Sequence, residues 1–150
     1  MSYCNILTAV QFVQRYSNDC AVLAKMLNVP VENILGLAAH ESQHGIGRIA
    51  VEDNNYFSMH APAPLQIGED VARKDPHVRV AKFSSFLQSG QSFVARYGQA
   101  VKGKADPREF AQALVRVHFN TGNPKTGGAA NYAQKVVDAI AMVKLRMVCQ

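Results

Sequence analysis

Apolar residues recur every three or four positions along most of this sequence, and one central segment breaks the pattern. This spacing places apolar side chains on one face of an α-helix. It predicts helices over residues 8–16, 18–28, 30–43 and 107–117, one from a cap at Ser89 to Val101, and a last one from Tyr132 to Met147. Because 150 residues suit one compact unit with its own core, we expect a single domain over residues 1–150.

The segment that breaks the pattern begins at Asn54 and has the composition of loops and short strands. Its first part, NNYFSMHAPAPLQIGED, contains an Asn pair and two prolines, which favour turns. Val78 and Val80 then flank a polar residue and Phe83 follows, as in a half-buried strand. We therefore expect a small β-hairpin or folded loop at residues 64–86, inside a mainly α-helical domain.

The chain is basic, with 16 Lys and Arg residues against 11 Asp and Glu residues and a formal net charge of +5. This balance favours an anionic partner such as the acidic polymer of a bacterial cell wall. The basic residues form no run and Trp is absent, so we expect no nucleic-acid partner. No stretch approaches the roughly 18 apolar residues of a membrane span, so we expect no membrane partner.

Two features bear on the compartment in which the protein acts. The first stretch, MSYCNILTAVQFVQRYSNDC, lacks the basic start and long apolar core of a Sec signal, which predicts synthesis in the cytoplasm and export, if any, by another route. Cys4, Cys20 and Cys149 form no C-x-x-C pair, and their spacing does not fit a zinc knuckle. We expect idle buried thiols, with one disulfide and one remaining thiol as the alternative in an oxidising compartment.

A short motif at the end of the third predicted helix suggests a metal site. His40, Glu41 and His44 form H-E-x-x-H, in which two histidines on one helix face hold zinc and the glutamate acts as base. The longer form of the motif needs a third histidine, but Ala50 occupies that position. A zinc metalloprotease therefore stays an alternative, and we expect no metal.

The apolar stripe of the same helix favours another role for its glutamate. Ile34, Leu37 and Ala38 lie seven, four and three positions before Glu41, so its side chain extends the core-facing side. A carboxyl group at the end of such a stripe is partly desolvated, which raises its pKa. A raised pKa suits a general acid for glycoside cleavage, whereas a solvated glutamate in the last turn is the alternative. We expect the two histidines at the rim of a cleft.

The segment ILGLAAHESQHGIGRIAVEDNNYFSMHA resembles the catalytic segment of the bacterial glucosaminidase family, which are peptidoglycan hydrolases of lysozyme-like fold. The family has Ala-x-x-Glu-Ser and then Asn-Leu-Phe, and here Ala38, Glu41, Ser42 and the stretch 55–57 stand at those positions. AKFSSFLQSGQSFVARY and HFNTGNPKTGGAANYAQKV resemble later family segments in the same order. The resemblance, from about residue 30 to 140, implies a lysozyme-like helical domain with a small β-hairpin lobe flanking the active-site cleft.

The resemblance also implies roles for individual residues. It makes Glu41 the general acid and points to Glu69 as the second carboxylate, for which a solvated turn is the alternative. Carboxylates about 6.5 to 9.5 Å apart would give inversion, and assistance by the substrate's 2-acetamido group is the other route. The implied substrate-binding residues are Asn55, Tyr56, Phe57, Asp70 and Tyr132. Core packing is the alternative for Tyr132, and no cofactor is implied.

The sequence thus predicts an N-acetylglucosaminidase-type peptidoglycan hydrolase. A catalytic domain of this size suits an antibacterial toxin, such as a type VI secretion effector that acts in a rival's periplasm. Such a toxin travels with an immunity protein, which we expect to occlude the cleft. A lytic transglycosylase, a phage lysin, a zinc metalloprotease and a non-catalytic sugar-binding module of the same fold remain alternatives.

Overall fold

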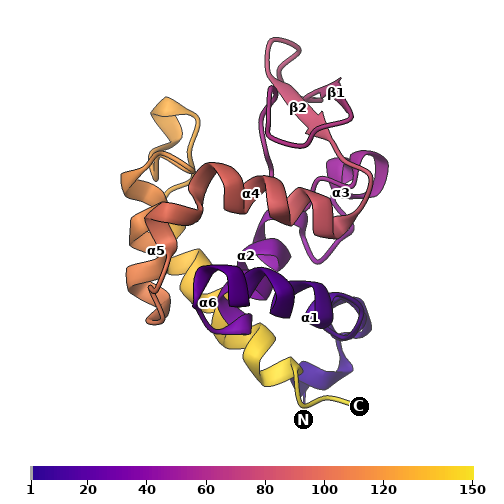
Figure 1. Ribbon diagram of the computed structural model, residues 1–150. Coiled ribbons are helices and arrows are strands. Elements are labelled where there is room, and N and C mark those ends of the chain that lie inside the picture. Colours follow the sequence, from indigo (N-terminus) through magenta and orange to yellow (C-terminus); the bar gives the residue numbers. More distant parts are fainter. Residues whose placement is uncertain (1) are drawn as a thin grey trace.

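Helix α2 (Val31–Ser42) lies at the centre of the fold, with α1 (Leu7–Leu27) and α6 (Tyr132–Arg146) packed against it (Figure 1). The computed structural model describes residues 2–150. Residues 33–39 of α2 are all buried, so this helix has almost no face open to solvent. The other elements are α3 (Arg48–Asp53), β1 (Gly68–Val71), β2 (Arg79–Lys82), α4 (Phe86–Val101), α5 (Pro107–Arg116) and the 3-10 turns Ser2–Asn5 and Pro124–Thr126.

The contact between α2 and α6 depends on a glycine. A Cβ atom on Gly36 would lie 2.6 Å from the Cα atom of Ile140, a distance that packed atoms do not tolerate. Any larger residue at this position would therefore push the two helices apart. Since Glu41 lies in the last turn of α2 and Tyr132 begins α6, this close approach sets the distance between these two side chains.

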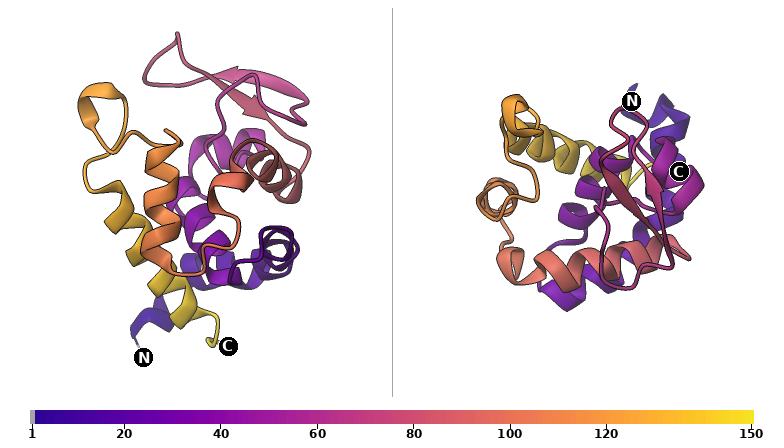
Figure 2. Two further views of the ribbon diagram at one scale, coloured as in Figure 1. Left: turned by 60° about the vertical axis from the view of Figure 1, so that its left-hand side comes forward. Right: turned by 90° about the horizontal axis from the view of Figure 1, so that it is seen from above.

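The small sheet projects from the helices as a hairpin (Figures 1 and 2). Strands β1 and β2 are antiparallel, with Glu69 opposite Ala81 and Asp70 opposite Val80. His60, in the loop before the hairpin, forms an isolated bridge with Val80 on the other edge of β2. The predicted mainly α-helical fold with a small β-hairpin is confirmed.

The predicted break between residues 8–16 and 18–28 is wrong, because both segments belong to one helix, α1. Ser17, next to the expected break, donates its hydroxyl to the carbonyl of Val13 and so is accommodated inside the helix. The buried face continues without interruption to Leu27. Polar residues at 17–19 therefore mark the solvent side of a long helix and not a turn.

Capping residues set where the later helices begin. Ser85, and not Ser89 as predicted, caps α4, since its hydroxyl accepts a hydrogen bond from the Gln88 N–H at 3.1 Å. Ser89 is buried within the helix. The predicted cap of α5 is confirmed, because the Asp106 carboxylate accepts from the Glu109 N–H at 3.0 Å.

The chain turns sharply between α1 and α2. Asn28 ends α1 in the left-handed conformation, with φ of 53°, and Pro30 precedes α2 as its N-cap. The two helices are bent by 119° relative to each other. Within residues 2–150, no single helix is long and apolar enough to cross a membrane, and only this bent pair together reaches that length and composition.

A disulfide joins the two ends of the described chain. Cys4 and Cys149 are bonded, with 5.6 Å between their Cα atoms, and Figure 1 shows both ends side by side below α1 and α6. Cys20 is a buried free thiol. The prediction of three idle thiols is therefore wrong for two of them, and the alternative of one disulfide with one remaining thiol is confirmed.

Candidate active site

The last turn of α2 opens onto a cleft of about 510 Å³ between the hairpin and the loop that joins α5 to α6. The residues that line it are Glu41, Ser58, His60, Val78, Tyr97, His118, Phe119, Asn120, Thr121, Thr126 and Gly127. Glu41 is the one carboxylate among these residues. The structure thus places Glu41 at the end of the buried stripe of α2, facing the cleft, and its role as general acid stays a prediction.

Glu41 is held by hydrogen bonds from α6 and from the loop that follows α3. The Tyr132 hydroxyl donates to its Oε2 atom at 2.7 Å, and the Ser58 hydroxyl donates to its backbone carbonyl at 3.3 Å. Burial raises the pKa of Glu41, and the hydrogen bonds from Tyr132 and Ser58 offset part of this rise. The carboxyl group thus keeps its proton to a higher pH than a solvated glutamate does, as a proton donor requires.

Tyr132 has the buried position that the stripe of its helix predicts, and its predicted substrate-binding role stays a prediction. Its side chain is 1% exposed and packs in the core, while its hydroxyl reaches the Glu41 carboxyl. Burial and the neighbouring Glu41 raise the pKa of Tyr132, so the phenol stays protonated and acts as a donor. Tyr132 does not line the cleft itself, so it acts on the site through Glu41.

The structure does not bring the two histidines of the H-E-x-x-H motif together. Helix α2 ends at Ser42, and both Gln43 and His44 have left-handed backbone conformations, with φ of 53° and 54°. The His40 ring lies edge-on to Tyr132 of α6, whereas the His44 ring lies edge-on to Phe12 of α1.

These separate contacts remove the geometry on which the zinc-protease alternative depends, because zinc ligands at i and i+4 need a helix that continues through both. The Nε2 atom of His44 is buried without a hydrogen-bond partner in the part of the chain described here. Residues 2–150 also contain no group of three His, Cys, Asp or Glu side chains arranged to bind a metal ion.

The stretch from Asn55 to Phe57, predicted to line a sugar groove, does not line the Glu41 cleft. Asn55 is 1% exposed. Its side-chain N–H groups donate to the carbonyls of Met59 and Ala81, and its side-chain oxygen accepts from the Met59 N–H, each at 2.9 Å. Phe57 is fully buried in the core, and Tyr56 faces a different pocket. The prediction is therefore wrong for Asn55 and Phe57, whose polar and apolar contacts instead fasten the loop to β2 and the helices.

Glu69 lies on the exposed side of β1. Its Oε1 atom accepts from Arg79 at 2.7 Å and its Oε2 atom accepts from Gln66 at 3.1 Å. These hydrogen bonds lower the pKa of Glu69 and keep it ionised. Glu69 does not line the Glu41 cleft, to which the hairpin contributes Val78, so its role as second carboxylate stays a prediction.

Asp70 fixes the hairpin to α3. Its Oδ2 atom accepts from Arg48 at 2.9 Å, beside the buried carboxyl group of Asp53. Burial and the neighbouring Asp70 raise the pKa of Asp53 to about 6, whereas hydrogen bonds from Asp53, the Val71 N–H and Arg48 lower that of Asp70 to about 2. The contacts of Asp53 and Arg48 with Asp70 were not predicted from the sequence, because only the fold brings α3 next to β1. A substrate-binding role for Asp70 stays a prediction.

The far wall of the cleft comes from a loop that sequence reasoning identified only as glycine-rich. The Asn120 side chain closes this loop by accepting from the N–H groups of Gly122 and Ala129, at 2.9 and 3.0 Å. A Cβ atom on Gly128 would lie 2.2 Å from the Thr121 hydroxyl, so glycine is required where the loop folds back on itself. The available signal was the mixture of Asn, Thr and Gly, which marks a structured turn but not its place in a cleft.

Comparison with known protein families gives one match. Residues 17–145 match the glucosaminidase model, described as mannosyl-glycoprotein endo-beta-N-acetylglucosaminidase. The match spans all helices from the middle of α1 to the end of α6. No curated protein sequence matches the chain.

Several solved structures resemble the fold, among them the following three. A chain of a type VI secretion system effector-immunity complex from Pseudomonas protegens is 52% identical over 99% of this chain and 100% of that chain, with a TM-score of 0.90. A peptidoglycan hydrolase from Sphingomonas sp. A1 is 24% identical over 92% of each chain, with a TM-score of 0.74. The glycoside hydrolase domain of Salmonella typhimurium FlgJ is 25% identical over 91% of this chain and 89% of that chain, with a TM-score of 0.68. The predicted lysozyme-like fold is confirmed.

Proposed function

The chain belongs to the glucosaminidase family, and we propose that it is a glycoside hydrolase that cleaves the glycan backbone of peptidoglycan. The observation that carries this proposal is the buried Glu41 carboxyl, whose pKa is raised by burial and which is hydrogen-bonded to Tyr132 and faces the cleft. The likeness to a peptidoglycan hydrolase and to a glycoside hydrolase domain supports the choice of substrate. The formal net charge of +5 also favours an acidic polymer.

In the proposed reaction Glu41 protonates the oxygen of the leaving sugar. Cleavage of a glycosidic bond needs this proton because the departing alkoxide is otherwise a poor leaving group. Tyr132 acts as a positioning residue, since its hydroxyl fixes the Oε2 atom and leaves the other carboxyl oxygen to the cleft. The α2–α6 contact at Gly36 maintains this arrangement.

Glu69 is the proposed second carboxylate. Its ionised state, maintained by Arg79, is the one that a base or a stabiliser of positive charge at the anomeric carbon requires. A neutral acid and an ionised partner form the pair of states that glycoside hydrolysis uses. Assistance by the substrate's 2-acetamido group remains the second route, because Glu41 is the one carboxylate among the described residues that line the cleft.

The proposed biological role is that of a type VI secretion effector that acts on peptidoglycan in the periplasm of a target cell. The 52% identity to a chain of an effector-immunity complex supports it. We further propose an immunity protein that occludes the Glu41 cleft. In a host bacterium, the chain should be toxic when directed to the periplasm, and co-production of the cognate immunity protein should remove the toxicity.

Mass spectrometry of fragments released from purified peptidoglycan tests the proposed reaction. A new reducing N-acetylglucosamine end is the expected product, and a reducing N-acetylmuramic acid end would move the cut to the other bond. A 1,6-anhydro end would identify a lytic transglycosylase. Intact glycan strands after prolonged incubation would contradict the proposal.

A further inference from the structure

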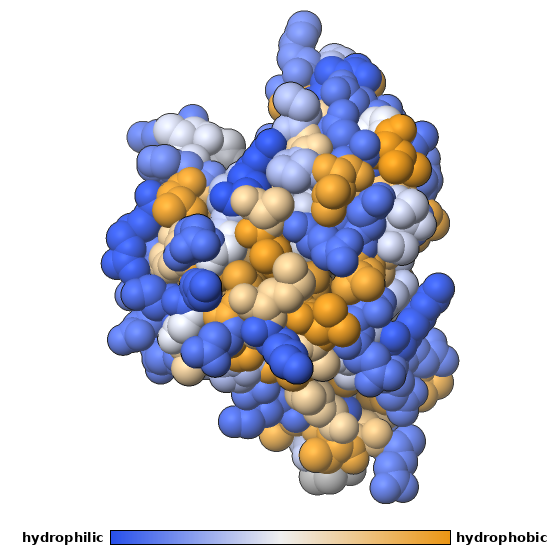
Figure 3. Space-filling model, in the orientation of Figure 1, coloured by the Kyte–Doolittle hydropathy of each residue, from blue (hydrophilic) through white to orange (hydrophobic). Residues whose placement is uncertain are grey.

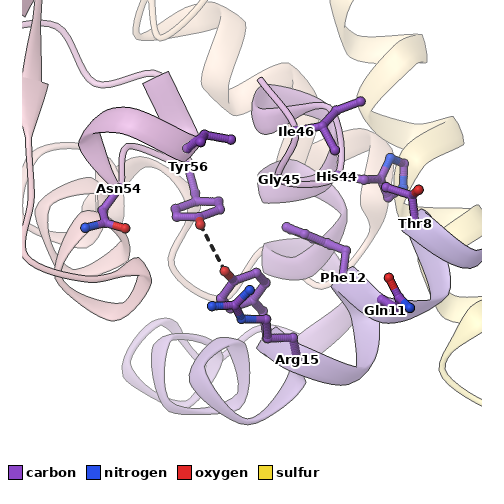
Figure 4. A pocket seen from close by; sticks show the side chains of 11 residues that line it. Thr8, Gln11, Phe12, Arg15, His44, Gly45, Ile46, Asn54 and Tyr56 are labelled. Carbon is purple, nitrogen blue, oxygen red and sulfur yellow. Dashed lines mark hydrogen bonds between the residues drawn. The ribbon is translucent and has the colours of Figure 1, made fainter. Parts of the chain in front are cut away.

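A second pocket, of about 390 Å³, lies between α1 and α3 and shares no lining residue with the Glu41 cleft (Figure 4). We call it the α1–α3 pocket. Its lining residues are Thr8, Gln11, Phe12, Arg15, Tyr16, His44, Gly45, Ile46, Val51, Asn54 and Tyr56. The five residues from α1 are spaced three, one, three and one positions apart, so one complete face of this helix points into the pocket.

The floor of the α1–α3 pocket is aromatic and kept open by a glycine. Phe12, Tyr16 and Tyr56 supply the rings, and Figure 4 shows Gly45 beside Phe12 and Tyr56. A Cβ atom on Gly45 would lie 3.2 Å from Phe12 and 3.6 Å from Tyr56, and the φ of +82° already disfavours any other residue. The turn after α2 therefore lets these rings line the pocket, although Phe12, Tyr16 and Tyr56 are only 3%, 8% and 7% exposed.

The floor also offers an unused hydrogen-bond donor. The hydroxyls of Tyr16 and Tyr56 are 2.9 Å apart and share one hydrogen bond, drawn dashed in Figure 4. Each hydroxyl carries one hydrogen, so the hydrogen of the accepting partner has no acceptor within residues 2–150. The amides of Gln11 and Asn54 add polar groups around the same space.

A positive charge without a counter-ion stands at the rim. The Arg15 guanidinium lies 5.3 Å from the centroid of the Tyr16 ring, and it forms no ion pair with any carboxylate of residues 2–150. Among the described residues, no carboxylate lines the α1–α3 pocket. Ile46 and Val51, which are 64% and 65% exposed, add apolar surface beside this charge.

We propose that the α1–α3 pocket binds an acetamido sugar that carries a carboxylate, the muramyl unit of peptidoglycan. The exposed side chains of Ile46 and Val51 suit the apolar face of a sugar ring. The amides of Gln11 and Asn54 suit its hydroxyl and acetamido groups. Arg15 matches the lactyl carboxylate through paired N–H groups. This inference rests on the proposed function, because it assigns a second attachment point for the same polymer.

Such an attachment point would increase the local concentration of glycan near the Glu41 cleft. Two linked contacts on one polymer convert the second binding step into an intramolecular one, with a gain set by the spacing along the strand. The pocket would contribute to holding the intact wall and not to the chemical step. Soluble monosaccharides therefore test it without any turnover.

The experiment is an NMR titration of the ¹⁵N-labelled full chain with N-acetylmuramic acid and, in parallel, with N-acetylglucosamine. These probes differ in the lactyl ether, and neither has a glycosidic bond to cleave. Saturable shifts are expected at the Gly45 and Ile46 amides with N-acetylmuramic acid, and binding of N-acetylglucosamine should be about tenfold weaker. Arg15→Gln should weaken the binding of N-acetylmuramic acid by about the same factor. Lys25→Gln, which removes one charge from the same helix about ten residues away, should not.

Shifts confined to the cleft amides of Asn120 and Thr121, equal binding of both sugars, or unchanged binding by Arg15→Gln would each overturn the inference. The proposed function is tested separately by cleavage of peptidoglycan. If the protein cleaves peptidoglycan but binds no sugar near Gly45, only the proposed sugar site is contradicted. If it binds sugar there but cleaves no glycan, only the proposed function is contradicted.

Discussion

The Tyr132 hydroxyl donates to the Glu41 carboxyl at 2.7 Å, across 91 positions of sequence. This hydrogen bond joins the start of α6 to the last turn of α2, and the close packing of Gly36 on Ile140 fixes the distance between them. A buried carboxyl group with one donor is a proton source whose pKa depends on both burial and that donor. The first predictions follow from this dependence.

Tyr132→Phe should shift the pH dependence of kcat upward. The tyrosine hydroxyl stabilises the ionised form of Glu41 and so lowers its pKa, which means that its removal raises the pKa further. The limb on which activity falls as the acid loses its proton should therefore move to higher pH. Tyr97→Phe, which changes a cleft tyrosine without a bond to Glu41, is the control. An unmoved limb in Tyr132→Phe would show that this hydrogen bond does not tune the acid.

Glu41→Gln should change how stability depends on pH. In the wild type the folded-state pKa of Glu41 lies above its unfolded value, so the folded state binds more protons and stability falls as pH rises from the unfolded pKa to the folded one. Glutamine does not titrate and so removes this loss. In thermal unfolding, the stability of the variant relative to the wild type should therefore increase as pH rises between the two pKa values. Glu109→Gln, at an exposed position of α5, should not show this gain. Parallel curves for wild type and Glu41→Gln would contradict a raised pKa.

Glu69→Gln separates the two routes to the products. If Glu69 is the second carboxylate, the variant should lose about 10²-fold or more in kcat while its fold is unchanged, because the side chain is exposed. Glu52→Gln, at another exposed glutamate near the hairpin, is the matched control. Near-normal activity of Glu69→Gln would assign the role to the substrate's acetamido group.

Loss of the terminal disulfide should destabilise the fold without changing the site. Cys4 and Cys149 close a loop of 145 positions, and removing such a cross-link costs about 2 to 5 kcal/mol, largely because the unfolded chain gains freedom. Urea unfolding of the Cys4→Ser, Cys149→Ser double variant should show that loss. Reductant should lower the stability of the wild type to the same level and leave the double variant unchanged. Equal midpoints for the oxidised wild type and the variant would mean that the cross-link contributes nothing.

Local sequence signals predicted the helices and the position of Glu41, because both depend on residues three and four apart. The same signals missed α3 and the left-handed conformation of Gln43, which ends α2 at Ser42, one residue before the predicted end. That end decided between two interpretations of one motif, since it turns His44 away from His40 toward α1.

Residues whose roles depend on distant partners could not be predicted from spacing. Asn55 fits a family motif, but its side chain forms hydrogen bonds to Met59 and Ala81 inside the protein. Ala81 lies 26 positions away in the sequence. The wall of the cleft around Asn120 required the packing of α5 against α6. Tyr132 was identified through its resemblance to a family tyrosine, and the helix stripe alone indicated only a core residue.

The rate of peptidoglycan lysis by Glu41→Gln tests whether Glu41 is the general acid. Glutamine has nearly the same size and can still accept the Tyr132 hydrogen bond, but it cannot donate a proton to the leaving sugar. We expect a folded variant whose lysis rate falls by about 10² to 10⁴, with Glu109→Gln unaffected. Lysis at the wild-type rate by the folded Glu41→Gln variant would contradict that role.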